Sequence, residues 1–225
     1  MGSHFQSVKL TFKSIPKETK DAIVLLQENT WLSSEKWYLA GGTALALQYG
    51  HRMSYDLDFF TEHDTVDTEK ISNHLSKIGN WIITSRDSKT LYGELNTVKC
   101  SFIAYPDFVP GKQTHSLKNL RIVDTHDIAV MKIMAISQRG KKRDFFDLYW
   151  YLKHGDSLEN VLKNVEKKYP YKKHNFHHFL KSLLYFDDAE GDADPQIYFE
   201  ATWDDIKKYF ENLIPLVAKK ILDLR

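Results

Sequence analysis

The feature that most constrains this chain is a glycine pair, Gly41-Gly42, between a short apolar run and an amphipathic segment. Residues 37–40 have the pattern of a buried strand and residues 43–49 that of a helix, so the glycines are predicted to form the turn between them. A backbone without Cβ atoms allows a ligand to approach closely at such a turn. The free amides and the positive dipole end of the following helix favour a phosphate group, and Thr43 is predicted to cap that helix.

Two aspartates follow in an alternating segment, residues 55–60. The alternation is typical of a strand, and it sends Asp56 and Asp58 to one face and Leu57 and Phe59 to the other. The two carboxylates then lie roughly 6–7 Å apart along the strand. Such a pair is able to hold magnesium ions that bridge nucleotide phosphates. A lone Asp-x-Asp is most often a solvated turn, but the preceding glycine turn favours a phosphate site.

A lysine interrupts a mostly apolar segment in the later half of the chain. Residues 124–139 carry helix start signals, and Gly140 stands just past the predicted end. Lys132 lies within this helix, where an ammonium group is costly unless it meets an anion. It is therefore expected to reach the surface, to pair with a structural carboxylate, or to contact phosphate.

A second helix is predicted for residues 143–153, so the two helices form a hairpin. Asp144 and Asp147 are three residues apart and share a face of this helix. One aspartate in a first turn is usually a cap or a dipole complement. A pair beside Lys132 is better explained by a site, in which Asp144 holds the lysine or acts as a base towards an acceptor hydroxyl. Arg139 lies two turns beyond Lys132, close to the same face.

These motifs together carry a family resemblance. Gly41-Gly42-Thr43 followed by Asp56-Leu57-Asp58 resembles the signature of the DNA polymerase beta-like nucleotidyltransferase superfamily. The fuller run LAGGTALALQYGHRMSYDLDFF, with DIAVMKIMAISQRGKKRDFFDLYWYL at residues 127–152, is similar to the AbiEii/AbiGii-type nucleotidyltransferase toxin family. The resemblance implies an α/β (α+β) fold with a mixed sheet flanked by helices. We expect a nucleotidyltransferase core at residues 5–120 and a helical region at 121–225 that completes the cleft.

The expected reaction is magnesium-dependent transfer of a nucleoside monophosphate from a nucleoside triphosphate to an acceptor hydroxyl. Gly41, Gly42 and Thr43 are expected to hold phosphates, Arg52 to add charge together with His51, Asp56 and Asp58 to hold Mg²⁺, and Arg139 to assist in nucleotide binding. The resemblance places Lys132 and Asp144 in the catalytic set, with Lys132 also on the triphosphate, and it adds Asp147 to the nucleotide-binding residues. It further implies a toxin of a toxin-antitoxin or phage-defence system, a cognate antitoxin protein as partner, and RNA such as tRNA 3′ ends as the acceptor.

The chain departs from its superfamily at one position. A third carboxylate is usual on a later strand, and the aligned residue here is Ser101. Serine is a poor magnesium ligand beside a carboxylate, and Glu94 and Asp107 are the candidate substitutes. Three alternatives stay open: an active site with two carboxylates, a weakened nucleotide-binding or protein-interaction module, and a small-molecule nucleotidyltransferase. The last would act on an aminoglycoside-like hydroxyl, for which an acidic acceptor groove is expected.

Composition excludes a disulfide-stabilised protein and a protein with a membrane-spanning segment. The lone cysteine, Cys100, excludes an internal disulfide framework, and no apolar stretch reaches the roughly 18 residues of a membrane span. The sequence thus predicts a cytoplasmic protein without a membrane segment.

The net charge of +1 argues against strong non-specific nucleic-acid binding. Residues 139–181 nevertheless contain eleven Lys or Arg against five acids, interleaved with aromatic residues. This pattern fits an RNA-binding surface and a solvated helical surface equally well.

Periodicity predicts the remaining elements. Helices are expected at residues 16–36, 66–78 and 196–225, and strands at 81–85, 90–95 and 98–105, the last two joined as a hairpin across 96–97. The acidic segment 187–194 is expected to face water.

Overall fold

A mixed β-sheet forms one half of the molecule. The computed structural model describes residues 9–112 and 114–222, and within them the sheet has seven strands in the order β3-β4-β5-β2-β1-β7-β6. The strands are β1 Tyr38–Ala40, β2 Leu57–Thr61, β3 Trp81–Arg86, β4 Thr90–Leu95, β5 Val98–Ala104, β6 Thr114–Leu117 and β7 Leu120–Val123. The pairs β2–β5 and β1–β7 are parallel, and the other neighbours are antiparallel.

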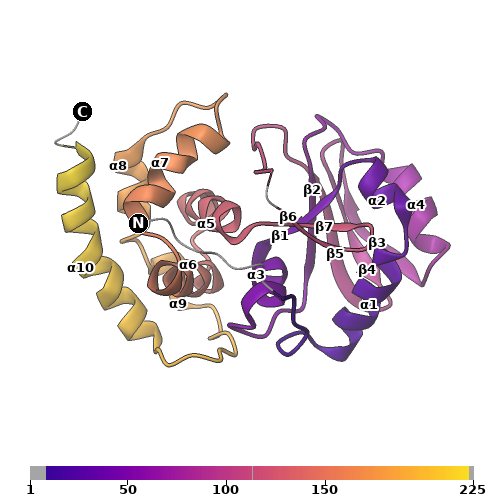
Figure 1. Cartoon of the computed structure of the whole chain (residues 1–225), viewed down its shortest axis with the longest axis horizontal. Helices are drawn as coiled ribbons and strands as arrows, with labels where there is room; N and C mark the ends of the chain where they lie inside the picture. The colour runs from indigo at the N-terminus through magenta and orange to yellow at the C-terminus, as the bar shows by residue number, and fades with distance from the viewer. Residues whose placement is uncertain (1–8, 113, 223–225) are drawn as a thin grey trace.

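Helices cover both faces of this sheet (Figure 1). On one side lie α1 Lys17–Gln27, α2 Thr30–Ser34 and α4 Thr68–Ser76. The helices of the later half of the chain form a helical layer on the other side together with α3, with α3 and α5 next to the sheet and α10 farthest from it (Figure 1). The helices on that side are α3 Gly41–Tyr49, α5 Thr125–Arg139, α6 Lys142–His154, α7 Leu158–Lys168, α8 Phe176–Ser182, α9 Asp187–Glu190 and α10 Trp203–Leu222.

The hydrophobic pattern of β2 determines which residues face the helical layer. Leu57 and Phe59 are fully buried, and the ring of Phe59 stacks on Phe102 at 4.9 Å on the side of α2. Because side chains alternate along a strand, Asp58 must point to the opposite face. A shift of one residue would exchange the two faces and bury the carboxylate, so the apolar core fixes the register.

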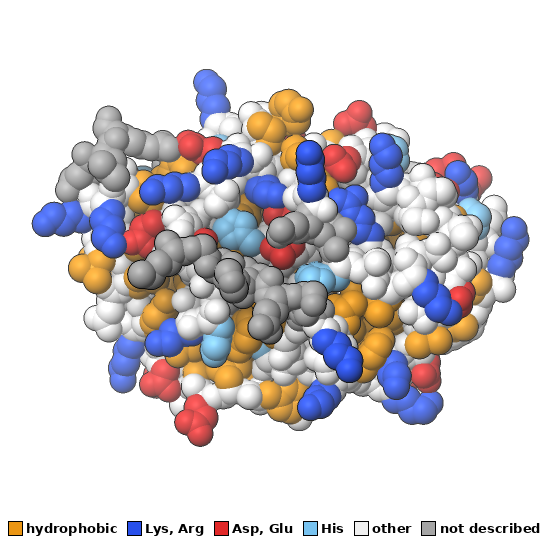
Figure 2. Space-filling model, in the orientation of Figure 1, with side chains coloured by type: hydrophobic (Ala, Val, Ile, Leu, Met, Phe, Trp, Pro, Cys, Tyr) orange, Lys and Arg blue, Asp and Glu red, His pale blue; other side chains and the backbone are white. Residues whose placement is uncertain are grey.

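Charges are mixed on the surface. On the face drawn in Figure 2, Lys and Arg side chains lie along the whole outline, with Asp and Glu side chains among them. In the part of the chain that is described, no helix combines the length and the apolar character needed to cross a membrane.

Most of the predicted elements are confirmed, including the hairpin of β4 and β5 and the helix that ends at Gly140 in the left-handed conformation. Two predictions are corrected. The helix expected at residues 16–36 is two helices, and the C-terminal helix starts only at Trp203. The strands β6 and β7 were not predicted. The division into residues 5–120 and 121–225 stays a prediction.

Candidate functional site

The glycine pair lies where β1 meets α3, as predicted, and each glycine is required for a different reason. Gly41 has φ +69, and an added Cβ would lie 2.9 Å from Asp58 Oδ2. A Cβ on Gly42 would lie 2.0 Å from the Arg52 guanidinium. Any larger residue would therefore displace one of two charged side chains, and at Gly41 it would also strain the backbone.

Thr43 has a role different from the predicted cap. The residue before the helix is Ala40, and no side chain caps it. Thr43 is buried, and its hydroxyl donates to the backbone carbonyl of Asp56 while also contacting Ser54 Oγ at 2.9 Å. The cap prediction is wrong, because this hydroxyl holds the segment that leads into β2. Thr43 also does not line the cleft that lies between the sheet and α5.

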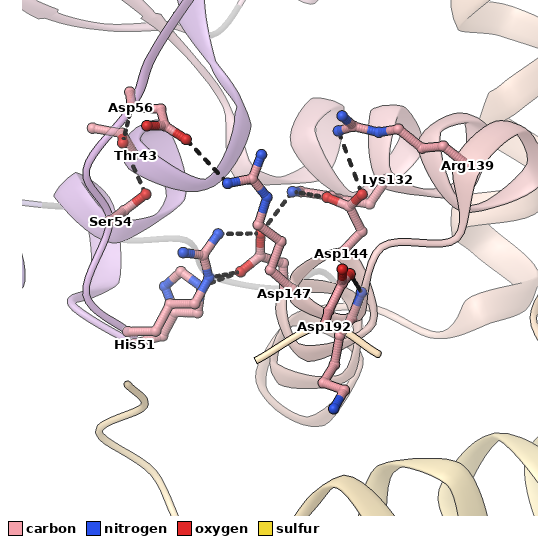
Figure 3. Close-up of polar contacts among 12 residues, drawn as sticks. Thr43, His51, Ser54, Asp56, Lys132, Arg139, Asp144, Asp147 and Asp192 are labelled. Atoms are coloured by element: carbon pink, nitrogen blue, oxygen red, sulfur yellow. Dashed lines mark hydrogen bonds and ion pairs between the residues drawn. The ribbon is translucent and has the colours of Figure 1, made fainter. Parts of the chain in front are cut away.

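The two predicted carboxylates face this cleft together. Asp56 directly precedes β2, and its Oδ2 accepts a hydrogen bond of 3.0 Å from Arg143 Nη1 (Figure 3). Asp58 lies opposite Ser101 in the β2–β5 pairing, and Ser101 Oγ donates to Asp58 Oδ1 at 2.6 Å. Serine thus occupies the position beside Asp58 at which the resemblance leads one to expect a third carboxylate.

The two candidate substitutes for that carboxylate lie elsewhere. Asp107 pairs with Lys172 at 2.8 Å, and Glu94 lies opposite Lys99 in the sheet. Neither residue lines the cleft. Of the carboxylates that line the cleft, Asp56 and Asp58 lie together on the sheet wall, whereas Asp144 is paired with Lys132.

Lys132 is buried and paired. Its Nζ lies 2.6 Å from Asp144 Oδ1 and 2.7 Å from Asp147 Oδ2, and its side chain is 8% exposed. Lys132 was expected to reach the surface, to pair with a carboxylate or to contact phosphate, and the structure shows the pairing with carboxylates. The same side chain also lines the cleft, on the side of α5.

Asp147 is the centre of a buried charge network (Figure 3). Its carboxylate contacts Arg52 Nε at 2.5 Å, Arg52 Nη2 at 2.9 Å and His51 Nε2 at 2.7 Å, in addition to Lys132. Burial alone would raise the pKa of Asp147, but Arg52 and Lys132 outweigh it and hold the pKa well below the usual range. Asp147 is fully buried and does not line the cleft, so it holds the cations rather than the nucleotide.

The same network changes the predicted roles of His51 and Arg52. Burial lowers the pKa of His51 despite the opposing effect of Asp147, which keeps the imidazole neutral at pH 7. The expectation that His51 adds positive charge is therefore wrong. Arg52 does line the cleft, with its guanidinium held against Gly42 by the bidentate contact to Asp147.

Asp144 keeps one oxygen free of hydrogen bonds. The carboxylate is fully buried, lines the cleft and receives Lys132 on Oδ1. Oδ2 has no hydrogen-bond partner among the described residues and lies 3.4 Å from Arg139 Nη2. Oδ2 is thus the Asp144 oxygen that accepts no hydrogen bond in the described part of the chain, beside the Arg139 guanidinium.

A distant acidic loop holds the first turn of α6, a contact that the sequence analysis did not predict. Asp192 accepts from the backbone N–H of Lys142 at 3.1 Å and from Lys141 Nζ at 3.2 Å, and Asp194 accepts from Lys142 Nζ at 3.1 Å. The prediction that this acidic segment only faces water is thus wrong for Asp192. The opposite charges of the two runs, KKR and DDAEGDAD, were the available signal.

The residues converge on one cleft of about 340 Å³ between the sheet and α5. Its charged lining is Arg52, Asp56, Asp58, Lys132, Arg139, Arg143 and Asp144, with Gly41 and Gly42 beside them. The described residues contain no grouping of three or more potential metal-ligating side chains. Mg²⁺ is commonly bound by one or two carboxylates together with substrate phosphates, and Asp56 and Asp58 fit that mode.

The buried histidine predicts a pH dependence of stability. Since the pKa of His51 is lowered from 6.5 in the folded protein, the unfolded chain binds a proton near that pH that the folded chain does not. The free energy of unfolding is therefore expected to fall as the pH drops from 7.5 to 5.5. Urea unfolding at both pH values should show a smaller fall in a His51→Gln variant, which keeps a donor for Asp147. An equal fall in both proteins would refute this role of His51.

The chain is similar to several known proteins in sequence and in fold. The family model described as "Nucleotidyl transferase AbiEii toxin, Type IV TA system" matches residues 25–221. An uncharacterized protein of Aquifex aeolicus is 39% identical over 184 residues, which cover 79% of this chain and 86% of that protein. The solved structure of MenT4, a nucleotidyltransferase toxin from Mycobacterium tuberculosis, is similar with a TM-score of 0.53 and 15% identity, over 89% of this chain and 86% of that one. At this identity the likeness to MenT4 is one of fold.

Proposed function

The chain belongs to the AbiEii nucleotidyltransferase toxin family, and from that premise we propose that it moves a nucleoside monophosphate from a nucleoside triphosphate to a hydroxyl of RNA, with Mg²⁺ held by Asp56 and Asp58. The observation that carries the proposal is the convergence of segments far apart in sequence. Asp58 comes from β2 and Asp56 directly precedes that strand, while Lys132 comes from α5 and Asp144 from α6. All four line one cleft beside the glycine turn.

The charge of the cleft supports a metal requirement. The network and the cleft lining contain four cations, Arg52, Lys132, Arg139 and Arg143, and four anions, Asp56, Asp58, Asp144 and Asp147. These charges cancel, so a bound triphosphate would add uncompensated negative charge. Bound Mg²⁺ would neutralise phosphate charge and lower the pKa of an attacking hydroxyl.

Other residues of this chain would bind the phosphates and accept the proton. The backbone at Gly41 and Gly42 would receive phosphate, and Arg139 and Arg143, with side chains about half exposed, would contact the incoming anions. In the transfer, the acceptor oxygen forms a bond to the α-phosphorus and the bond to pyrophosphate breaks. The hydroxyl proton would go to Asp144 Oδ2, which lies beside Arg139, while Lys132, itself paired with Asp147, holds Asp144 Oδ1.

Two observations favour a large anionic acceptor. The rim of the cleft carries Arg139 and Arg143, whereas an aminoglycoside-like acceptor is a cation and would favour an acidic rim. Tyr171, in the basic segment 139–181, is 80% exposed and available for stacking on a base. We therefore propose RNA, such as tRNA 3′ ends, as the acceptor, and a cognate antitoxin protein as the partner that controls the reaction.

A second candidate function rests on Ser101. Because serine stands beside Asp58 in place of a carboxylate, the same fold would also suit a module that binds nucleotides without turnover. Binding of nucleoside triphosphates without transfer to any acceptor would favour this candidate.

Incubation of the protein with each labelled nucleoside triphosphate, Mg²⁺ and total RNA tests the proposal. We expect label to appear in RNA with at least one nucleotide, and to disappear when EDTA removes the metal. Label on an aminoglycoside but not on RNA would replace the proposed acceptor. Undiminished transfer in EDTA would contradict the metal requirement.

A further inference from the structure

One segment of the chain contacts both the helix α6 and the loop that carries Arg52. We call this segment, residues 192–198 between α9 and α10, the strap. Its first residues contact the first turn of α6, from which Arg143 and Asp144 line the cleft. Its last residues contact residues 51–53, from which Arg52 lines the cleft. The strap itself does not line the cleft, but it joins two of the parts that do.

The strap supplies a cap that α6 lacks in its own sequence. The residue before this helix is Lys141, and its side chain makes no capping hydrogen bond. Asp192 Oδ2 instead accepts from the backbone N–H of Lys142 at 3.1 Å, from a position 50 residues further along the chain. A carboxylate at this place satisfies one of the free amides of the first turn and complements the helix dipole. The start of α6 is therefore held by a residue from outside the helix.

The side chain of Lys142 adds to this attachment. It is only 7% exposed, which is unusual for a lysine. Its Nζ lies 3.1 Å from Asp194 Oδ1 and 5.4 Å from the centre of the Trp203 ring. The lysine is thus held between the strap and the start of α10. Because Lys142 directly precedes Arg143 and Asp144 in the first turn, this attachment determines where their side chains enter the cleft.

The other end of the strap is attached by main-chain hydrogen bonds. The carbonyl of Gln196 accepts from the N–H of Met53 at 2.8 Å, and the N–H of Tyr198 donates to the carbonyl of His51 at 2.8 Å. Ile197 and Arg52 form an antiparallel bridge between these two bonds. The pairing holds the backbone of Arg52, whose guanidinium lies beside Gly42.

The two attachments are joined by a short and stiff link. One residue, Pro195, lies between Asp194 and Gln196. The proline ring fixes its own φ near about −65°, and two residues of chain span at most roughly 7 Å. The link therefore limits how far the first turn of α6 is able to move from residues 51–53.

We propose that the strap is a positioning element of the transfer reaction, which holds the start of α6 at the spacing from residues 51–53 that the reaction needs. The inference rests on the proposed function, because it assigns the strap to the reaction in that cleft. Contact across the cleft depends on this spacing, since Arg143 Nη1 reaches Asp56 Oδ2 at 3.0 Å from the first turn of α6. Asp144, the proposed proton acceptor, follows in the same turn.

A longer strap tests this role. Insertion of two glycines between Asp194 and Pro195 keeps every contacting residue but lengthens the link by up to roughly 7 Å. We expect kcat for label transfer to fall at least about tenfold and KM for the nucleotide to change less than about threefold, because a small misplacement of a reacting group lowers the rate steeply. The matched control is the same insertion after Glu200, which lies in the same loop but outside the two attachments. Its kcat should stay within about twofold of that of the unaltered protein.

Variants of Asp192 test the attachment to α6 alone. Asp192→Ala should lower kcat about tenfold, whereas Asp192→Asn, which keeps an acceptor for the N–H of Lys142, should retain most of the rate. Asp187→Ala, at an exposed acid before the strap, is the control and should leave kcat unchanged. Hydrogen exchange gives a readout without substrate. The amide of Lys142 should exchange faster in Asp192→Ala, while the amide of Met53 stays protected by Gln196.

The outcomes separate the strap from the reaction. An unchanged kcat in the lengthened protein, or an equal fall for both insertions, would overturn the positioning role and leave the transfer reaction standing. If thermal unfolding shows that the lengthened protein does not fold, Asp192→Ala is compared with Asp192→Asn, and equal kcat values for these two would overturn the role. Unchanged exchange at Lys142 in Asp192→Ala would overturn the attachment. Absence of transfer by the unaltered protein would overturn the proposed function, and the role of the strap with it.

Discussion

Replacement of Asp58 by alanine is expected to reduce transfer of label to RNA about 1000-fold. Asp58 and Asp56 are the two carboxylates on the sheet wall of the cleft, and the third, Asp144, is paired with Lys132, so loss of Asp58 removes half of the proposed metal ligands. Metal ions contribute several kcal/mol to stabilisation of transition-state charge, and ~4 kcal/mol corresponds to about three powers of ten in rate. The rate of label incorporation under saturating nucleotide measures the effect.

The matched control for Asp58→Ala is Glu94→Ala. Glu94 lies on β4 of the same sheet, outside the cleft, and its removal should change the rate less than about twofold. Both variants should unfold at nearly the same temperature as the unaltered protein. Transfer at the normal rate by a folded Asp58→Ala protein would show that this carboxylate does not serve the reaction.

Replacement of Asp147 by asparagine is expected to lower the free energy of unfolding by about 3–5 kcal/mol. The substitution keeps the shape of the side chain but removes the charge that Arg52 and Lys132 share. Both cations are buried, with side chains 6% and 8% exposed, so water cannot replace the lost carboxylate. Removal of one partner of a buried ion pair lowers the free energy of unfolding because the other charge stays buried without a counter-ion.

Urea unfolding at pH 7.5 measures this effect. The control is Asp21→Asn, which removes an acid from a surface pair with Lys17, and the side chains of Asp21 and Lys17 are 58% and 83% exposed, respectively. Surface pairs contribute about 0–1 kcal/mol, so the control should remain close to the unaltered protein. A loss below about 1 kcal/mol for Asp147→Asn would mean that the network is not a structural anchor.

Regular local patterns made much of the fold predictable. The alternation in β2 and the caps of α5 are properties of neighbouring residues, and the structure confirms both. The strands β6 and β7, of four residues each, were not predicted, because they depend on pairing of β7 with the distant β1 and of β6 with β7. They become strands because β1 and its neighbours supply partners.

The candidate site was predictable in its members but not in their contacts. Asp56, Asp58, Lys132 and Asp144 were identified from the sequence, and the structure brings them to one cleft. The partners of each charged group depend on segments far apart in the chain, which spacing does not reveal. The prediction for Thr43 was wrong for the same reason. Its hydroxyl binds the segment before β2 and does not cap its own helix.

The buried network around Asp147 has a consequence for any attempt to divide the protein. His51 and Arg52 belong to the first half of the chain, and their shared carboxylate lies 96 and 95 residues later. A fragment ending near residue 120 would keep the guanidinium and lose its counter-ion, while the complementary fragment would keep the carboxylate beside Lys132 alone. Neither piece should be stable by itself. Mixing the two should restore structure, because this network and the pairs of Arg143 with Asp56 and of Lys172 with Asp107 can form only between them.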